Sequence, residues 1–221
     1  MATHGGHEHV AADETLFGQE FWDQRYGGSP ALWSGRPNPQ LVAEAAGLEP
    51  GRALDAGCGE GADAIWLVER DWQVTAVDIS TVALDRGTAQ AARLGDPIAS
   101  RISWQHADLR TWAPAPRSYD FVNAQYMQLP PHLRTGLFDR LAAGVASGGT
   151  LLIVGHSPSD LATAARRPPL PELFFTADEI ADALDASLFK ILVRQARPRQ
   201  VRDPDDQLIT IHDEVLTARR R

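Results

Sequence analysis

Residues 53–61 read Ala-Leu-Asp-Ala-Gly-Cys-Gly-Glu-Gly, and this stretch decides the fold of the chain. It begins as a short apolar strand and ends in glycines, directly before an apolar helical pattern over 62–70. Glycine reaches positive φ and lets a ligand approach the main chain closely. The start of a helix adds unpaired N–H groups and a partial positive charge. The stretch therefore predicts a strand, a ligand-binding turn and a helix.

Strands and helices alternate from this stretch towards the C-terminus. The expected strands cover 52–56, 74–77, 102–106, 119–124 and 150–155, and the expected helices cover 62–70, 81–94, 133–146 and 176–184. Two final strands, 190–195 and 207–217, have no helix between them and flank a turn rich in Arg, Pro and Asp. Alternation of this kind predicts an α/β fold with a parallel sheet covered on both faces, and the closing hairpin adds an antiparallel strand.

Local signals predict several helix boundaries. Ser80 stands where an N-cap is expected before the helix at 81–94. Thr176 and Glu179 form the pattern of a capping box. Gly148 and Gly149 are expected to end the helix at 133–146.

The residues before the first strand form a segment of different character. Residues 15–47 are rich in aromatic side chains, with a helix expected over 15–26 and a shorter one over 40–46. We expect this segment to act as a lid on the core formed by 48–221, both belonging to one domain.

The first fourteen residues are polar and are expected to be a disordered tail. His4, His7 and His9 lie close enough together in this tail to bind a metal ion, which stays open as an alternative. No metal site is expected elsewhere. Cys58 is the only cysteine, which excludes a site with several thiolates, and the sequence offers no persuasive set of acids for a magnesium site.

Composition excludes several classes of function. The net charge of −8 disfavours nucleic acid and anionic lipid as partners. No apolar stretch approaches the roughly 18 residues of a membrane span, and the N-terminus lacks the apolar core of a signal peptide. The chain is therefore expected to be cytoplasmic, as a monomer or a homodimer acting on a small molecule.

An acidic residue follows the second strand at the position where nucleoside-binding folds use one. Asp78 lies 21 residues after Gly57, where a carboxylate can accept hydrogen bonds from ribose hydroxyls. The spacing Gly57-x-Gly59-x-x-Ala62 also satisfies the dinucleotide pattern, so an NAD(P)-dependent oxidoreductase is an alternative. Asp55, directly ahead of the glycines, suits a ligand with an ammonium group better than a pyrophosphate.

The block from Arg52 to Ser80 resembles motif I and the following strand of class I S-adenosylmethionine-dependent methyltransferases. Upstream, Phe21-Trp22-Asp23-x-Arg25-Tyr26 and Trp33-Ser34-Gly35-x-Pro37-Asn38 resemble the small-molecule branch that includes tellurite-resistance and thiopurine-type methyltransferases. The resemblance covers about residues 15–217. It implies a Rossmann-like, seven-stranded, mostly parallel sheet of order 3-2-1-4-5-7-6 with strand 7 antiparallel, and S-adenosyl-L-methionine as cofactor.

The resemblance also assigns roles to individual residues. The implied cofactor-binding residues are Trp33, Asp55, Ala56, Gly57, Cys58, Gly59, Asp78, Ile79, Asp108, Leu109, Asn123, Ala124 and Gln125. Asp55 and the glycines would surround the methionine part, together with the end of the fourth strand. Asp78 would bind the ribose, and Ile79, Asp108 and Leu109 would border the adenine.

Candidates for the acceptor side follow the fourth and fifth strands. Tyr126, His132 and His156 are the candidate catalytic residues, and Tyr126 and Arg36 are candidates for binding substrate. A histidine there would be placed to take a proton from the acceptor. Each of these residues also has an ordinary structural explanation. The expected activity is methyl transfer to a heteroatom of a small molecule, with a non-catalytic cofactor-binding module as a further alternative.

Overall fold

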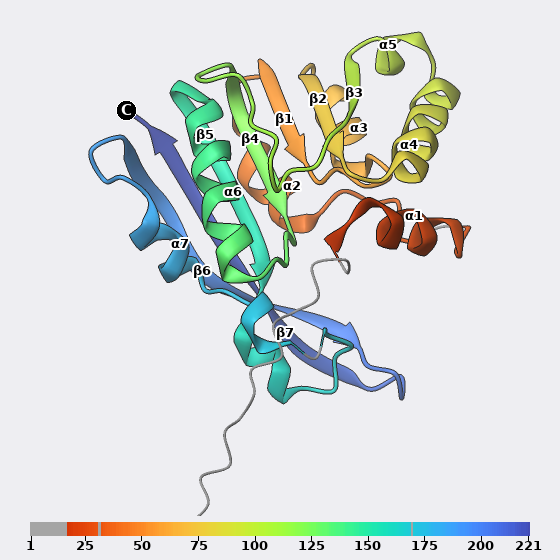
Figure 1. The fold of residues 1–221 in the computed structure, drawn as a ribbon, viewed down its shortest axis with the longest axis vertical. Coiled ribbons are helices and arrows are strands. Elements are labelled where there is room, and N and C mark those ends of the chain that lie inside the picture. The colour runs from red at the N-terminus through yellow and green to blue at the C-terminus, as the bar shows by residue number, and fades with distance from the viewer. Residues whose placement is uncertain (1–16, 31, 169) are drawn as a thin grey trace, which may run out of the picture.

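A seven-stranded sheet of order β3-β2-β1-β4-β5-β7-β6 forms the centre of the molecule (Figure 1). The structure, a computed structural model, describes residues 17–30, 32–168 and 170–221, so the expected tail and its histidines lie outside the described residues. β7 runs antiparallel to β5 and β6, and the remaining pairs are parallel, which confirms the expected order. The strands are β1 (Arg52–Ala56), β2 (Gln73–Asp78), β3 (Ile102–His106), β4 (Tyr119–Gln125), β5 (Val145–His156), β6 (Phe189–Arg202) and β7 (Leu208–Arg220).

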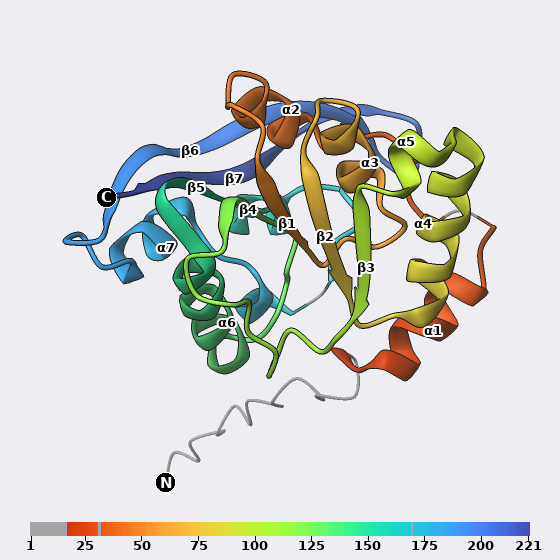
Figure 2. The ribbon, with the colours of Figure 1, turned by 90° about the horizontal axis from the view of Figure 1, so that it is seen from above.

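Helices cover both faces of this sheet (Figure 2). They are α1 (Gln19–Gly27), α2 (Pro39–Ala45), α3 (Ala62–Val68), α4 (Thr81–Leu94), α5 (Asp96–Ala99), α6 (Pro131–Gly144) and α7 (Ala177–Ala183), with short 3-10 turns η2 (Pro158–Ala162) and η3 (Pro171–Leu173). α6 and α7 pack into one apolar core, whereas α2, α3 and α4 pack into the other. Among the described residues, none of the helices combines the length and apolar character needed to cross a membrane.

Side-chain alternation along β1 serves both cores. Ala53 belongs to the core on the α3 side and Leu54 to the core on the α6 side, and neither side chain is exposed. A parallel strand buried on both faces explains why β1 reads as an apolar run.

The predicted helix starts are confirmed, because the Ser80 hydroxyl accepts from Ala83 N and Thr176 and Glu179 form a complete capping box.

The expected end of α6 was wrong. The helix stops at Gly144 and β5 begins at Val145, so Gly148 and Gly149 lie inside a strand. Gly148 has φ +76°, and a Cβ on Gly149 would lie 2.9 Å from the carbonyl oxygen of Asp120. The two glycines therefore allow the irregular backbone at the start of β5, where the register of its pairing with β4 shifts.

The final hairpin is much longer than expected. Arg197 and Pro198, which we expected in a turn, lie within β6. Proline is tolerated there because β6 is the edge strand. On its outer side no neighbouring strand would accept a hydrogen bond, so the missing N–H of proline costs no bond. β5 pairs with β7 only as far as His156 and Asp213, so the outer part of the hairpin projects beyond the sheet (Figure 1).

Candidate functional site

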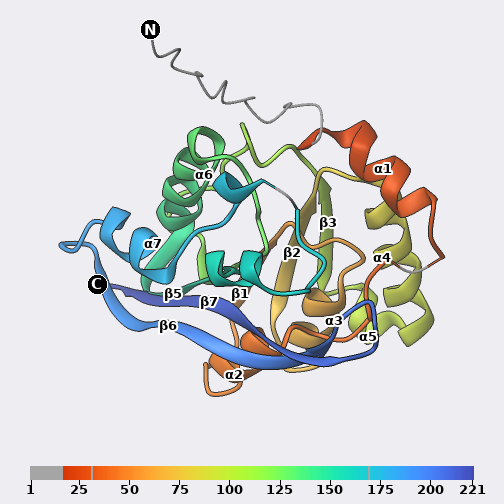
Figure 3. The same cartoon turned by 90° about the horizontal axis from the view of Figure 1, so that it is seen from below.

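The parallel strands end together at one edge of the sheet (Figure 3), and the predicted site residues lie at or just after these strand ends. Gly57 follows β1, Asp78 ends β2, Gln125 ends β4 and His156 ends β5. This is the edge at which open α/β sheets bind ligands.

The glycine loop after β1 is fastened to the end of β2. Gly57 N and Cys58 N both donate to the carbonyl oxygen of Val77, at 2.8 and 3.0 Å. Gly59 N donates to Asp78 Oδ2 at 2.8 Å, and Ser80 N donates to Oδ1 at 2.9 Å. Burial raises the pKa of Asp78 above its ordinary value, although these N–H groups oppose the shift. Asp78 thus shapes the loop as well as facing the site.

Aromatic side chains of the N-terminal segment cover this loop. Gly59 has φ +53°, and a Cβ there would lie 2.8 Å from the Tyr26 hydroxyl. Trp33 Nε1 donates to the same hydroxyl at 3.0 Å. Tyr26 is buried, whereas Trp33 is 51% exposed. The structure thus places both Trp33 and Tyr26 beside the loop. Tyr26 belongs to the upstream sequence motif, but the sequence alone assigned it no role at the site.

Buried polar side chains lie behind the loop at the ends of β1 and β4. The register pairs Asp55 with Asn123, and Asn123 Nδ2 donates to Asp55 Oδ1 at 2.9 Å. Gln125 Nε2 donates to Asp63 Oδ2 at 3.0 Å, and Asn38 N donates to Asp63 Oδ1 at 2.7 Å. Three buried oxygens have no hydrogen-bond partner among the described residues: Asp55 Oδ2, Asn123 Oδ1 and Gln125 Oε1.

Two carboxyl groups in this cluster titrate abnormally. Burial, reinforced by the charge of Asp63, holds the pKa of Asp55 well above its ordinary value. Burial also raises the pKa of Asp63 to about 6. The charge of Asp63 disfavours ionisation of Asp55, and among the described residues neither carboxyl group forms an ion pair.

This arrangement distinguishes between the possible ligand groups. Unpaired acceptor oxygens in a buried site need a donor, and an ammonium group supplies three together with a positive charge. A pyrophosphate would bring further acceptors and negative charge next to Asp55 and Asp63. The residues present therefore fit the methionine end of S-adenosylmethionine and do not fit a dinucleotide phosphate.

The residues expected near the adenine follow the ends of β2 and β3. Ile79 is half-buried, and its carbonyl oxygen lies 3.0 Å from His106 Nε2. Leu109 is buried, and the Asp108 carboxylate is held by the Arg110 guanidinium at 2.8 Å. Burial would raise the pKa of Asp108, but the contacts with Arg110 outweigh burial and lower it. The Asp108 carboxylate is thus already engaged by a neighbour.

Two of the acceptor-side candidates form a pair. The rings of Tyr126 and His156 lie 4.4 Å apart, tilted by 33°. The Tyr126 hydroxyl donates to Asp213 Oδ1 at 3.1 Å. Burial and the charges of Arg167 and Arg199 lower the pKa of His156 to about 3, and its Nδ1 has no partner among the described residues. His156 is therefore a neutral hydrogen-bonding group and a weak base.

The other two candidates are placed differently. His132 lies exposed at the start of α6, and Arg36 is exposed in the loop before α2. Neither has a described contact with Tyr126 or His156.

Comparison with known proteins agrees with this geometry. Residues 53–149 match the methyltransferase domain family, a span that contains the glycine loop, Asp78 and the acidic cluster. These residues thus form a methyltransferase domain, and the chain is similar to class I S-adenosylmethionine-dependent methyltransferases. S-adenosylmethionine is accordingly its cofactor.

Relatives of this methyltransferase have named small-molecule activities. A probable thiol methyltransferase 2 from Arabidopsis thaliana is 28% identical over 73% of this chain and 76% of its own length. A trans-aconitate 2-methyltransferase from Rhizobium rhizogenes is 37% identical over 53% of this chain. The matched part is only 43% of that relative's length, so less than half of it is represented here.

Solved structures share the whole fold. One, described as showing the conversion of a disulfide bond into a thioacetal group during echinomycin biosynthesis, has a TM-score of 0.70 at 26% identity and covers 91% of this methyltransferase and 92% of its own chain. TehB from Haemophilus influenzae has a TM-score of 0.67 at 18% identity, covering 92% of this chain and 67% of its own. At that identity the likeness to TehB concerns the fold alone.

Proposed function

We propose that this chain transfers the methyl group of S-adenosylmethionine to a heteroatom of a small molecule, namely N, O, S, Se or Te, by in-line displacement. The observation that carries the proposal is the set of buried oxygens of Asp55, Asn123 and Gln125 that have no hydrogen-bond partner in the part of the chain that the structure describes. They match an ammonium group at the position where the methionine end would lie.

In this proposal, the residues of the chain bind the cofactor and align it with the acceptor. Asp55 and Asp63 balance the ammonium charge, and Asp78 accepts from the ribose hydroxyls through the lone pairs left by its two backbone bonds. Ile79, Asp108 and Leu109 border the adenine, while Tyr26 and Trp33 keep water from the loop. When bound, the cofactor supplies a methyl group on a sulfonium, which a nucleophile displaces. Alignment alone contributes roughly 7–11 kcal/mol to such reactions.

The acceptor lies against Tyr126 and His156 in this proposal. His156 Nδ1 is buried and unpartnered among the described atoms, so it can accept a hydrogen bond from the acceptor without being charged. Its low pKa makes it a positioning group, and a thiol or carboxylic acid acceptor reacts as its own anion. The names of the Arabidopsis and Rhizobium relatives support small acceptors.

Two alternatives are less consistent with the site. A dinucleotide would place phosphates near the acidic cluster, and the single lysine, Lys190, leaves no Tyr-x-x-x-Lys pair for an oxidoreductase. A non-catalytic module would not need His156 Nδ1 at the end of β5, a buried acceptor without a partner among the described residues.

Turnover with trideuteromethyl-labelled cofactor tests the proposal. The protein is incubated with small thiols, amines, carboxylic acids, selenite and tellurite, and products are detected by mass spectrometry. We expect one acceptor class to gain the labelled methyl group, with Asp55→Asn much slower. Cofactor binding without labelled product from any class would favour the non-catalytic module.

A further inference from the structure

An arginine-lined hollow adjoins the acceptor end of the sheet. It has a volume of about 360 Å³ and lies between the segment after η2 and the projecting part of the β6–β7 hairpin. Its lining includes four arginines, Arg166, Arg167, Arg199 and Arg202, and one acidic residue, Asp203. Such a concentration of guanidinium groups stands out in a chain whose net charge is −8.

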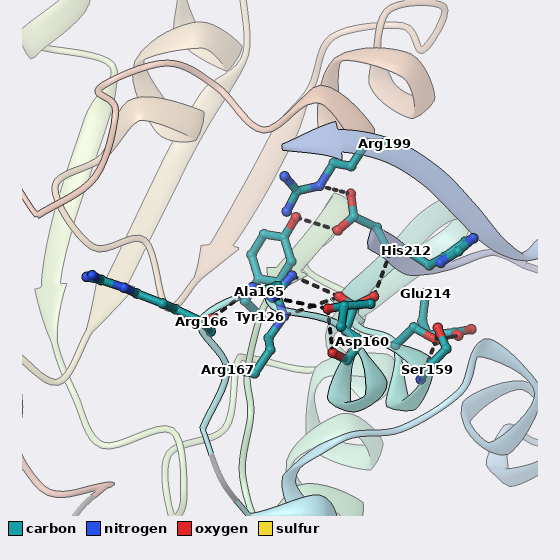
Figure 4. A network of polar contacts seen from close by, with 12 residues as sticks. Tyr126, Ser159, Asp160, Ala165, Arg166, Arg167, Arg199, His212 and Glu214 are labelled. Carbon is teal, nitrogen blue, oxygen red and sulfur yellow. Dashed lines mark hydrogen bonds and ion pairs between the residues drawn. The ribbon is translucent and has the colours of Figure 1, made fainter. Parts of the chain in front are cut away.

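Two of these arginines form ion pairs with buried carboxylates (Figure 4). Asp160 is fully buried and receives Arg167 Nη2 at 2.8 Å and the main-chain N–H of His212 at 2.9 Å. Asp213 is fully buried and receives Arg199 Nε at 2.8 Å. Because both carboxylates are buried and already paired, they fix the guanidinium groups without covering the hollow.

The other two arginines are less constrained. Arg202 pairs at 3.4 Å with Asp206, whose side chain is 82% exposed, so solvent weakens this pair. Arg166 is exposed, and in the part of the chain that the structure describes no carboxylate forms an ion pair with it. Its side chain extends away from Asp160 in Figure 4. Arg166 thus lines the hollow without an acidic partner among residues 17–30, 32–168 and 170–221.

The hollow is connected to the acceptor candidates through shared partners. Asp213 accepts from both Arg199 and the Tyr126 hydroxyl. Arg167 and Arg199 lie near enough to His156 for their charges to lower its pKa. An anion held by these arginines would therefore lie beside the pair of rings that borders the acceptor.

We propose that this hollow binds a carboxylate of the methyl acceptor, so that the substrate is a small organic acid. The inference rests on the proposed function, because it names the acceptor class of that site. Guanidinium groups bind carboxylates in a planar, two-point geometry, which favours arginine over lysine for this task. The acid group anchors one end of the molecule, and the nucleophilic atom lies towards Tyr126 and His156.

The inference is tested by comparing how tightly the protein binds each of several organic acids and the corresponding amide. The full chain, saturated with S-adenosylhomocysteine, is titrated calorimetrically with succinate, glutarate, tricarballylate and 3-mercaptopropionate, and with the primary amide of each. We expect at least one acid to bind about tenfold more tightly than its amide, since a charge-assisted pair replaces a neutral contact. Arg166→Gln is expected to remove this preference.

The controls separate the hollow from the cofactor site. Arg93→Gln removes an exposed arginine of α4 away from the hollow, and it is expected to retain the preference. No acid binding better than its amide, or a preference that survives Arg166→Gln, overturns the inference. The same titrations without S-adenosylhomocysteine report on the hollow alone, so a failure of cofactor binding would count against the proposed function and not against the arginine site.

Discussion

Asp78 connects the backbone of the glycine loop to the ligand-facing edge of the sheet. Both of its oxygens accept main-chain N–H groups, from Gly59 and Ser80. We expect a residue placed in this way to affect ligand binding both directly and through the shape of the loop.

Asp78→Ala is expected to raise the dissociation constant for S-adenosylhomocysteine about 10- to 100-fold, because hydrogen bonds to a charged group contribute about 1.5–3 kcal/mol. Calorimetric titration measures the change. Asp85→Ala, an exposed acid on α4, is the matched control and should bind like the parent. Unchanged affinity in Asp78→Ala would remove the ribose assignment.

The pKa of Asp63, about 6, predicts a pH dependence. Below pH 6 its carboxyl is protonated in the folded protein, whereas an ammonium ligand favours the ionised form. Affinity for S-adenosylhomocysteine should therefore rise between pH 5 and 7, by up to about tenfold per unit below the pKa. For the protein alone, this group's contribution to the free energy of unfolding falls as pH rises from 3.8 to about 6, because the folded state retains the proton longer.

Asp63→Asn should flatten this binding profile, and Asp85→Asn should leave it steep. Titrations at half-unit pH intervals provide the measurement. A parent profile that is flat from pH 5 to 7 would argue against an ammonium group at Asp63.

Sequence patterns predicted the residues of the site that belong to contiguous motifs. Asp55, Gly57 and Asp78 have the positions expected from the loop and its spacing. Asp63 and Tyr26 were missed although each lies within or beside a recognised motif, because their roles depend on how α3 and α1 pack. Asp213 carried no signal at all, since it reaches Tyr126 only through the pairing of β7 with β5.

At the scale of elements, one side chain joins the lid to the core. Asp23 on α1 accepts from the Ser80 hydroxyl at 2.6 Å and from Val82 N at 3.3 Å, at the start of α4. Burial would raise the pKa of Asp23, but hydrogen bonds from Ser80 and Gln19 outweigh burial and lower it. A carboxylate here also interacts favourably with the positive end of α4.

Asp23→Ala should lower the free energy of unfolding by about 1 kcal/mol, the usual effect of losing a helix cap. It should also weaken S-adenosylhomocysteine binding several-fold, because α1 carries Tyr26 over the glycine loop. Urea unfolding and calorimetry measure the two effects. Glu20→Ala, an exposed acid on the same helix, is the control, and equal behaviour of the two variants would show that α1 is not held through Asp23.

Some element boundaries could be predicted from the sequence and others could not. β1, β3 and α4 have the predicted bounds because glycines, an N-cap and apolar periodicity mark them locally. The length of β6 was underestimated because Pro198 argues against a strand unless that strand is known to lie at the edge of the sheet. Edge position is a property of the completed sheet.

At the scale of the whole molecule, buried polar contacts fasten the projecting hairpin to the sheet. Asp213, on β7, accepts from Tyr126 after β4, from Arg199 on β6 and from Gln40 on α2, the last at 3.2 Å. Segments far apart in the sequence thus share one fully buried carboxylate.

Asp213→Ala is expected to reduce the free energy of unfolding by about 1.5–3 kcal/mol, because a fully buried carboxylate loses its hydrogen bonds with Tyr126, Gln40 and the partly exposed Arg199. Asp206→Ala breaks the exposed pair with Arg202 and should change stability by less than about 1 kcal/mol. Urea denaturation compares the two variants. Equal effects would show that the hairpin is not fastened through Asp213.

We infer that the glycine loop, Asp78 and the acidic cluster form the binding site for S-adenosylmethionine. Calorimetric titration of the purified protein with S-adenosylhomocysteine, with NADH as a parallel ligand, tests it most directly. One-to-one binding of S-adenosylhomocysteine in the micromolar range, with no heat from NADH, is the predicted result. Binding of NADH without binding of S-adenosylhomocysteine would contradict the claim.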